Sequence, residues 1–291
     1  MTYIIQQVLN MLQLGSIYAL IALGYTMVYG VLQMINFAHG DIFMIGAFLC
    51  FLSLTLLKGS FALSLVVSIS GAAVLGVVTE RFAYRPLRHA PKVSAIITAL
   101  GVGVFLENFT LALSPYPKHI PSVLSGTQWV LGGVTLSALQ VMTIALGVGL
   151  MLILDFLVFR TKLGMALRAL SWDVTNVPLM GISVNRVVSV TFAIGAALAG
   201  AAGNIYAVTY PVIDPYMGVM VGWKAFISAV VGGIGNIRGA VLGGFILAGV
   251  EVIAAVVLPS TYRDVVAFSL LMTLLIYRPY GLLGRAKTLK V

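Results

Sequence analysis

Charged residues are scarce in this chain, and the scarcity decides its class before any motif is considered. Only 9% of the 291 residues are Asp, Glu, Lys or Arg, while 60% are hydrophobic and the mean hydropathy is +1.08. A globular domain carries about 25% charged residues, so a soluble protein of this length would lack the charge to cover its surface. The composition predicts a polytopic membrane protein.

Other absences narrow the chemistry. The single cysteine, Cys50, lies in an apolar segment, so no disulfide or thiolate metal site can form within the chain. No GxxxxGK[ST], HExxH or GxSxG motif occurs, which excludes ATP hydrolysis by a P-loop and gives an intramembrane hydrolase no support. We therefore predict no catalytic residue, no metal and no cofactor. The first apolar run lacks a preceding basic segment, so we expect it to be a retained span.

The basic residues are concentrated in three places. Twelve of the 17 Lys and Arg fall in segments 80–92, 160–186 and 278–290, each beside an apolar run. Cytoplasmic loops of membrane proteins show this enrichment, so the net charge of +9 indicates topology, and no nucleic-acid partner is expected. Counting spans between these loops predicts an N-terminus outside, a C-terminus inside and an external loop at 114–137.

The apolar runs have the length of helices, and none shows the alternation of a barrel strand. We expect spans near 4–31, 35–57, 61–79, 93–113, 138–159, 187–208, 239–258 and 262–277. A run at 223–234 is short for a span, and whether it crosses or re-enters stays open. The prediction is an all-α fold: a transmembrane bundle of eight or nine helices that forms one domain over 1–291.

Two glycine-interrupted polar stretches, INFAHGD at 35–41 and VVGGIGNIRGAVLGG at 230–244, lie near opposite ends of the chain. Paired interruptions of this kind often mark a transport pathway. Two interpretations stay equally weighted for each stretch: a pathway lining, or a tight turn at the cytoplasmic interface where Asp41 and Arg238 touch water. The candidate pathway residues are Asn36, His39, Gly40, Asp41, Glu107, Asn108 and Asn236.

The spacing within the first stretch and the remaining polar residues refine these expectations. If the first stretch is helical, Asn36 and His39 share a face and Asp41 points away, which argues against a His–Asp catalytic pair. Glu107 and Glu251 are candidates for interior roles, because buried ionisable groups in a membrane are costly and often functional. Lys224 and Asp155 lie near span ends, where local pairs or interfacial positions are expected.

The basic segment 160–186 begins with a helical pattern. Leu163, Ala166, Leu167 and Leu170 fall on one side of it. Such an amphipathic segment can lie on lipid headgroups or dock on a cytosolic partner, and composition does not separate the two.

Sequence motifs distinguish between lipid binding and docking on a cytosolic partner. Segments GYTMVYGVLQMINFAHGDIFMIGAF, ERFAYRPLR, ITALGVGVFLEN and KAFISAVVGGIGNIRGAVLGG occur in the order found in the branched-chain amino-acid permease family of ABC importers, and the resemblance covers nearly the whole chain. The 160–186 loop also resembles the coupling loop of such permeases, G-x-A-x-R-A followed by D and L-x-G-I. The residues carrying that pattern are Gly164, Ala166, Arg168, Ala169, Asp173, Leu179, Gly181 and Ile182.

The resemblance implies a permease that moves branched-chain or other hydrophobic amino acids across a bacterial inner membrane by alternating access. It also implies a second homologous or identical permease, two cytosolic ATP-binding subunits and an external substrate-binding protein, with membrane lipid around the bundle. ATPase coupling would fall to Gly164, Ala166, Arg168, Ala169, Asp173 and Gly181. The alternatives are a same-family importer of urea, short amides or other amino acids, and a stand-alone ion-coupled carrier.

The chain departs from the family pattern at two places. From Trp172 it reads WDVTNVPL, where relatives carry a more alanine-rich and charged stretch, and Pro178 is expected to end or kink a helix there. Asp41 stands where many relatives have Glu, so the acid is kept on a shorter side chain.

Overall fold

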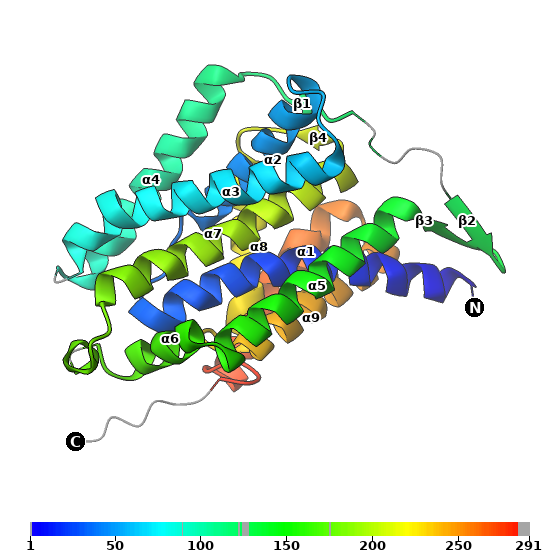
Figure 1. Ribbon diagram of the computed structural model, residues 1–291. Coiled ribbons are helices and arrows are strands. Elements are labelled where there is room, and N and C mark those ends of the chain that lie inside the picture. Colours follow the sequence, from blue (N-terminus) through cyan, green and yellow to red (C-terminus); the bar gives the residue numbers. More distant parts are fainter. Residues whose placement is uncertain (1, 89, 122, 124–127, 175, 285–291) are drawn as a thin grey trace.

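The computed structural model describes residues 2–88, 90–121, 123, 128–174 and 176–284, and these form a helical bundle (Figure 1). The α-helices are α1 (Thr2–Leu32), α2 (His39–Thr55), α3 (Phe61–Thr79), α4 (Lys92–Leu113), α5 (Ala138–Arg160), α6 (Lys162–Trp172), α7 (Val184–Thr209), α8 (Met217–Gly232), α9 (Ile237–Val257) and α10 (Arg263–Tyr277). The connections include one π-helical turn, η1 (Glu80–Tyr84), and three 3₁₀ turns, η2 (Arg85–Leu87), η3 (Val177–Met180) and η4 (Ser260–Tyr262). They also include four short strands, β1 (Lys118–His119), β2 (Gln128–Leu131), β3 (Val134–Ser137) and β4 (Val212–Ile213).

The predicted all-α membrane bundle is confirmed. Six helical segments among the described residues are long and apolar enough to cross a membrane: Thr2–Leu32, Phe61–Leu87, Val93–Leu113, Ala138–Arg160, Val184–Thr209 and Ile237–Val257. Helices α2 and α8 are apolar but only 17 and 16 residues long. At 1.5 Å per residue each is about 25 Å in length, less than the ~30 Å hydrocarbon core. Helix α8 begins at Met217, six residues before the start expected from the sequence.

Helix α1 forms the centre of the bundle. It is buried continuously from Gly15 to Val28, as expected of a helix that is apolar on every face. It packs mainly against α7 and α9, with α2, α5 and α8 alongside. Helix α4 stands away from the bundle axis (Figure 1) and contacts the rest chiefly through α2 and the π-helical turn η1.

Glycines bring helices α2 and α8 into close contact. A Cβ atom at Gly40 would lie 2.3 Å from the carbonyl oxygen of Gly218 and 2.8 Å from the Cα of Gly222. Small residues allow such backbone approach between membrane helices. The first turns of α2 and α8 consequently meet inside the bundle, beside α4.

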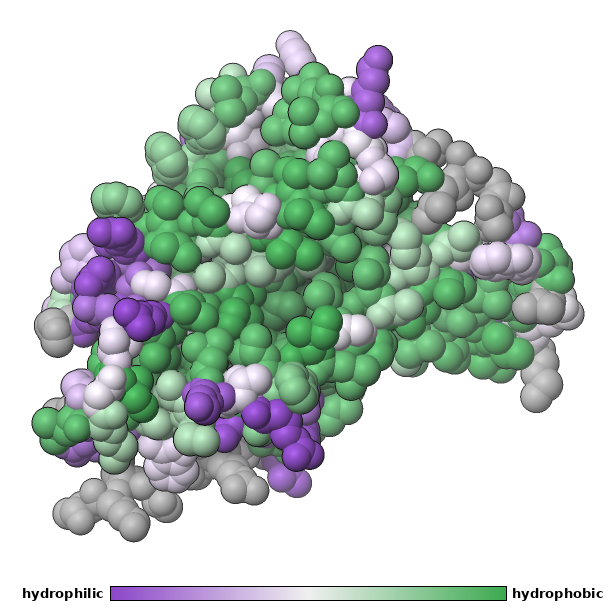
Figure 2. All heavy atoms as spheres, viewed as in Figure 1, coloured by the Kyte–Doolittle hydropathy of each residue, from purple (hydrophilic) through white to green (hydrophobic). Residues whose placement is uncertain are grey.

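The described parts of the three basic segments lie together at one end of the molecule. Arg88 Nη1 donates a 2.6 Å hydrogen bond to Asn185 Oδ1, and Asn236 Nδ2 donates a 2.9 Å bond to the carbonyl oxygen of Leu283. Hydrophilic residues gather at this end, on the left of Figure 2, and the flank of the bundle is mostly hydrophobic.

The other end carries the short strands. Strand β1 pairs with β4, and β2 pairs with β3 in a hairpin that stands off the bundle close to the N-terminus (Figure 1). The backbone N–H of Thr135 donates a 3.1 Å hydrogen bond to Gln6 Oε1, which ties the hairpin to α1. The predicted external loop 114–137 therefore contains β1, β2 and β3, at the end opposite the basic segments.

Candidate functional site

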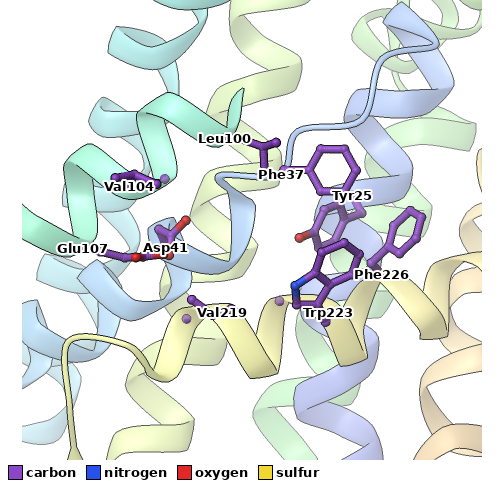
Figure 3. Close-up of a pocket in the computed structure, with 12 residues that line it drawn as sticks. Tyr25, Phe37, Asp41, Leu100, Val104, Glu107, Val219, Trp223 and Phe226 are labelled. Carbon is purple, nitrogen blue, oxygen red and sulfur yellow. The ribbon is translucent and has the colours of Figure 1, made fainter. Parts of the chain in front are cut away.

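A cavity of about 90 Å³ lies where α1, α2, α4 and α8 meet (Figure 3). It is lined by Tyr25, Phe37, Asp41, Leu100, Gly103, Val104, Glu107, Gly218, Val219, Gly222, Trp223 and Phe226. Its rim is open, because Leu100 and Val104 on α4 and Trp223 on α8 are 48%, 55% and 40% exposed. The cavity thus faces outward from this subunit between α4 and α8.

One wall of the cavity is acidic. Asp41, in the first turn of α2, is only 5% exposed, and its Oδ1 atom has no hydrogen-bond partner. Glu107 of α4 lies next to it (Figure 3). The ion pairs of the described residues join Arg88 to Glu80, Lys224 to Glu251 and Asp264, and Arg238 to Asp155. In the described part of the chain, neither cavity carboxyl group is paired with a cation.

The opposite wall is aromatic. Phe226 lies at the centre of this wall, with its ring centroid 6.1 Å from that of Tyr25, 6.0 Å from that of Phe37 and 6.1 Å from that of Trp223. All four residues line the cavity, and Tyr25 and Trp223 extend toward the acidic wall (Figure 3). An aromatic wall facing a carboxyl pair suits a ligand that has both an apolar part and a positive charge.

Asn36 and His39 lie behind this cavity, outside its lining. Asn36 is 2% exposed and accepts a 2.9 Å hydrogen bond from the hydroxyl of Tyr84. His39 is 1% exposed, and its ring centroid is 4.7 Å from that of Tyr25. Because α2 begins at His39, Asn36 precedes the helix, and the expected shared helical face does not form. Asp41, the residue expected to point away, is the one that reaches the cavity.

The remaining candidates lie elsewhere. Asn108 is exposed on α4 and its side chain donates a 2.8 Å hydrogen bond to the carbonyl oxygen of Val104 in its own helix. Asn236 caps α9 by accepting a 3.2 Å bond from the N–H of Gly239. Gly40 makes the contact between α2 and α8 described above. The two glycine-interrupted stretches therefore differ in position: the first is buried in the bundle, and the second forms a turn at its basic end.

Polar pairs account for the other charged residues within the spans. Lys224 Nζ lies 3.1 Å from Glu251 and 2.8 Å from Asp264, and the hydroxyl of Tyr18 donates a 3.0 Å hydrogen bond to Glu251. The local pair expected for Lys224 is confirmed. Glu251 is the interior acid of this group, which joins α1, α8, α9 and α10.

Helix α6 is docked on the end of α5 by residues of the loop pattern. A Cβ atom at Gly164 would lie 2.1 Å from the carbonyl oxygen of Val158, so the contact requires glycine. Arg168 donates a hydrogen bond to the same carbonyl group, and its guanidinium lies 5.6 Å from the centroid of the Phe159 ring. Leu167 and Leu170 are buried beneath the helix, as the amphipathic pattern predicts.

The rest of the loop ends helices and turns the chain. Asp173 follows the last residue of α6, and its carboxylate accepts hydrogen bonds of 3.0 Å and 2.6 Å from the backbone and side chain of Asn176. Gly181 ends η3 with φ +75°. Pro178 occupies the first turn of η3, six residues after α6 has already ended at Trp172, so the proline follows the helix end and does not cause it.

This loop exposes an unusual amount of apolar surface at the basic end. Met165, Trp172, Leu179 and Met180 are 63%, 90%, 84% and 75% exposed. We call these four residues the loop patch. Ala166 and Ala169 lie half-buried under it. Exposed apolar residues gathered on one loop often mark a contact with another protein.

The aromatic residues that line the cavity were not predicted from the sequence. Phe37 stands inside the first glycine-interrupted stretch, and Trp223 and Phe226 lie seven and four residues before the second. That placement gave no usable signal, because the two interruptions lie in different parts of the bundle and the aromatic residues meet Phe37 through the middle of α8. Tyr84 gave no signal either, since its partner Asn36 is 48 residues away.

Long apolar helices with basic residues at one end, a cavity between α1, α2, α4 and α8 and a docked amphipathic helix define a multi-pass membrane protein. Its similarity to known permeases makes it a permease subunit, a transport component and not an enzyme. Residues 7–275 match the family described as the branched-chain amino acid transport system permease component, and the chain belongs to that family.

Three relatives show how far the similarity extends. The chain is 41% identical to the high-affinity branched-chain amino acid transport system permease protein BraD of Pseudomonas aeruginosa, over 99% of this chain and 98% of that protein. It is 40% identical to the corresponding protein LivH of Escherichia coli over the same shares. The inner membrane ABC transporter permease protein YjfF of E. coli is 28% identical over 80% of this chain and 71% of its own length.

Proposed function

We propose that this chain is the membrane-spanning permease of an ATP-driven importer that carries branched-chain amino acids into the cell. The observation that carries the proposal is the match to BraD and LivH over 99% of the chain. Both are named as parts of high-affinity branched-chain amino acid transport systems, and no region of the chain remains for a separate function. The whole of 1–291 acts as one permease domain.

The chain works with partners. A permease without an ATPase motif needs two cytosolic ATP-binding subunits, an external protein that delivers the substrate and a second permease. The loop patch supports the need for ATP-binding subunits. Trp172 and Leu179 expose most of their apolar surface at the basic end, and a carrier that acts alone has no cytosolic partner to cover it. Gly164 and Arg168 hold α6 against α5, so that force applied to the loop patch moves α5.

The permease lies in the inner membrane with its N-terminus outside and its C-terminus inside. Grouping of the described basic residues of these segments at one end supports this orientation under the positive-inside rule. The hairpin of β2 and β3 then lies outside, on the side from which the substrate arrives.

Substrate passes along the face that carries the cavity, between α4 and α8. Asp41 and Glu107 line this part of the path, and Asn36, His39 and Gly40 hold α2 in place behind it. Asn108 lies on the outer face of α4, and Asn236 on the turn at the inner end of the path.

Uptake of labelled leucine by the reconstituted importer tests the proposal. Proteoliposomes containing the complex are expected to accumulate leucine only with ATP inside and binding protein outside. Trp172→Glu should remove ATP-driven uptake by weakening capture of the ATPase. Tyr280→Glu is the matched control, because Tyr280 is 61% exposed at the same end but lies outside the 160–186 loop. Leucine transport by the permease alone, driven by an ion gradient, would favour a stand-alone carrier.

Cysteine labelling tests the orientation. Cys50 is fully buried and should stay silent. A membrane-impermeant maleimide is expected to label Val130→Cys, in the β2–β3 hairpin, on intact cells. Trp172→Cys should react only after the membrane is opened, and the reverse pattern would refute the proposed orientation.

A further inference from the structure

We propose that Asp41, with Glu107 beside it, binds the protonated α-amino group of the transported amino acid during its passage. The inference rests on the proposed function and deepens it, because it assigns part of the substrate to named side chains. The permease itself then recognises amino acids, in addition to the external protein that delivers them.

The strongest observation is the state of the Asp41 carboxyl group. It is 95% removed from solvent contact, it lines the cavity, and its Oδ1 atom has no partner. Buried polar groups in proteins are nearly always hydrogen-bonded, and an exception calls for an explanation. An ammonium group in the cavity would supply three donors to this acceptor and its neighbour.

Charge points to the same ligand. Two carboxyl groups lie side by side where water is limited, and keeping both of them ionised there costs more free energy than in water because their repulsion is less screened. The nearest lysine on the cavity helices, Lys224 on α8, is bound to Glu251 and Asp264 and is not available. A cationic group that enters from outside the chain relieves the repulsion, and the substrate of an amino-acid importer carries one.

The aromatic wall fits the rest of the molecule. Tyr25 and Trp223 present rings toward the cavity, and aromatic faces attract both ammonium groups and apolar side chains. A cavity of about 90 Å³ holds the polar head of an amino acid, while its branched side chain can extend over the exposed rim of Leu100 and Val104.

Competition experiments on the purified importer complex, without the external protein, separate recognition of the amino group from general affinity. Labelled leucine is bound to the complex and displaced by leucine methyl ester, which keeps the amino group, or by 4-methylpentanoate, which lacks it. In the wild type the ester is expected to compete at least about tenfold better, since hydrogen bonds to charged groups contribute roughly 1.5–3 kcal/mol, equivalent to tenfold or more.

Asp41→Asn should abolish this preference and weaken leucine binding by about tenfold or more, and Glu107→Gln should reduce the preference in part. Asp155→Asn is the control, because Asp155 pairs with Arg238 on the surface away from the cavity. Asp41→Glu, which keeps the charge, should retain the preference and serves if the asparagine variant does not assemble.

Equal competition by leucine methyl ester and 4-methylpentanoate in the wild type would overturn the assignment. An Asp41→Asn complex that keeps the wild-type preference would also overturn the assignment. If the uptake by that complex differs from the wild type only in its pH dependence, Asp41 binds a proton and not the substrate. A complex that imports leucine but shows no saturable leucine binding would also refute it. Failure of the wild-type complex to import leucine at all would instead refute the proposed function.

Discussion

The hydroxyl of Tyr84 donates a 2.9 Å hydrogen bond to Asn36 Oδ1, and both groups are almost fully buried. The bond joins the π-helical turn after α3 to the segment that leads into α2. Within that turn, Glu80 accepts hydrogen bonds from Arg88 and from Ser189. Polar contacts of one π-helical turn therefore reach the start of α7, next to the 160–186 loop, and the segment that leads into α2.

Asn36→Leu should reduce uptake strongly by removing this bond. The leucine leaves the buried Tyr84 hydroxyl without an acceptor, and hydrogen bonds between membrane helices contribute about 0.6 kcal/mol on average, up to ~1.7. We expect a modest drop in melting temperature and a much larger loss of leucine uptake, measured in the reconstituted importer, because α2 carries Asp41.

Tyr84→Phe tests whether the bond itself matters. Combined with Asn36→Leu it removes both partners, and stability should then be lost by less than the sum of the two single changes. If Asn36→Leu transports normally, the bond has no role in positioning α2.

Gly40→Ala should disrupt the cavity through packing. The added methyl group would lie 2.3 Å from the carbonyl oxygen of Gly218, so α2 and α8 must separate. Overpacking of this kind costs about 1–3 kcal/mol, and we expect a lower melting temperature together with weakened leucine uptake.

Gly101→Ala is the matched control for that change, because a Cβ atom at Gly101 would meet no atom within 4 Å. Its uptake and melting temperature should equal those of the wild type. Equal behaviour of the two alanine variants would show that contact between α2 and α8 tolerates expansion.

The group around Lys224 should be important for stability. Lys224→Met leaves Glu251, which is 4% exposed, without its cation. Breaking a buried pair from one side costs about 3–5 kcal/mol, and the lower end applies here because Lys224 keeps some contact with solvent. The melting temperature of the detergent-solubilised complex measures the effect.

Adding Glu251→Gln to Lys224→Met should restore most of the stability, since the amide removes the uncompensated charge and still accepts the hydrogen bond from Tyr18. Asp264→Asn should cost less than about 1 kcal/mol, because Asp264 is 42% exposed and its pair is screened. A double variant as unstable as Lys224→Met would contradict an electrostatic origin.

Helix positions were predictable from the sequence because apolar runs identify membrane helices, and each expected span corresponds to one α-helix, although α2 and α10 are shorter than a full span. The start of α8 was missed, since the apolar run 223–234 excluded Met217 and the glycines that follow it. Depth was harder to predict: Asp41 and Asn236 stand in similar glycine-rich surroundings, yet one is buried and the other caps α9. Only tertiary contacts, such as that between Asp41 and α4, distinguish them.

Gly164→Ala should uncouple α6 from α5. The methyl group would lie 2.1 Å from the carbonyl oxygen of Val158, the atom that also accepts the hydrogen bond of Arg168, so one substitution disturbs both contacts. We expect the bundle to fold, because α6 lies at its edge, but ATP hydrolysis should no longer produce uptake. The measurement is the ratio of leucine transported to ATP hydrolysed in proteoliposomes. Gly149→Ala in α5 is the control, since its Cβ atom would meet nothing within 4 Å and its ratio should stay unchanged. A normal ratio for Gly164→Ala would mean that close docking of α6 on α5 is not what transmits movement to the bundle.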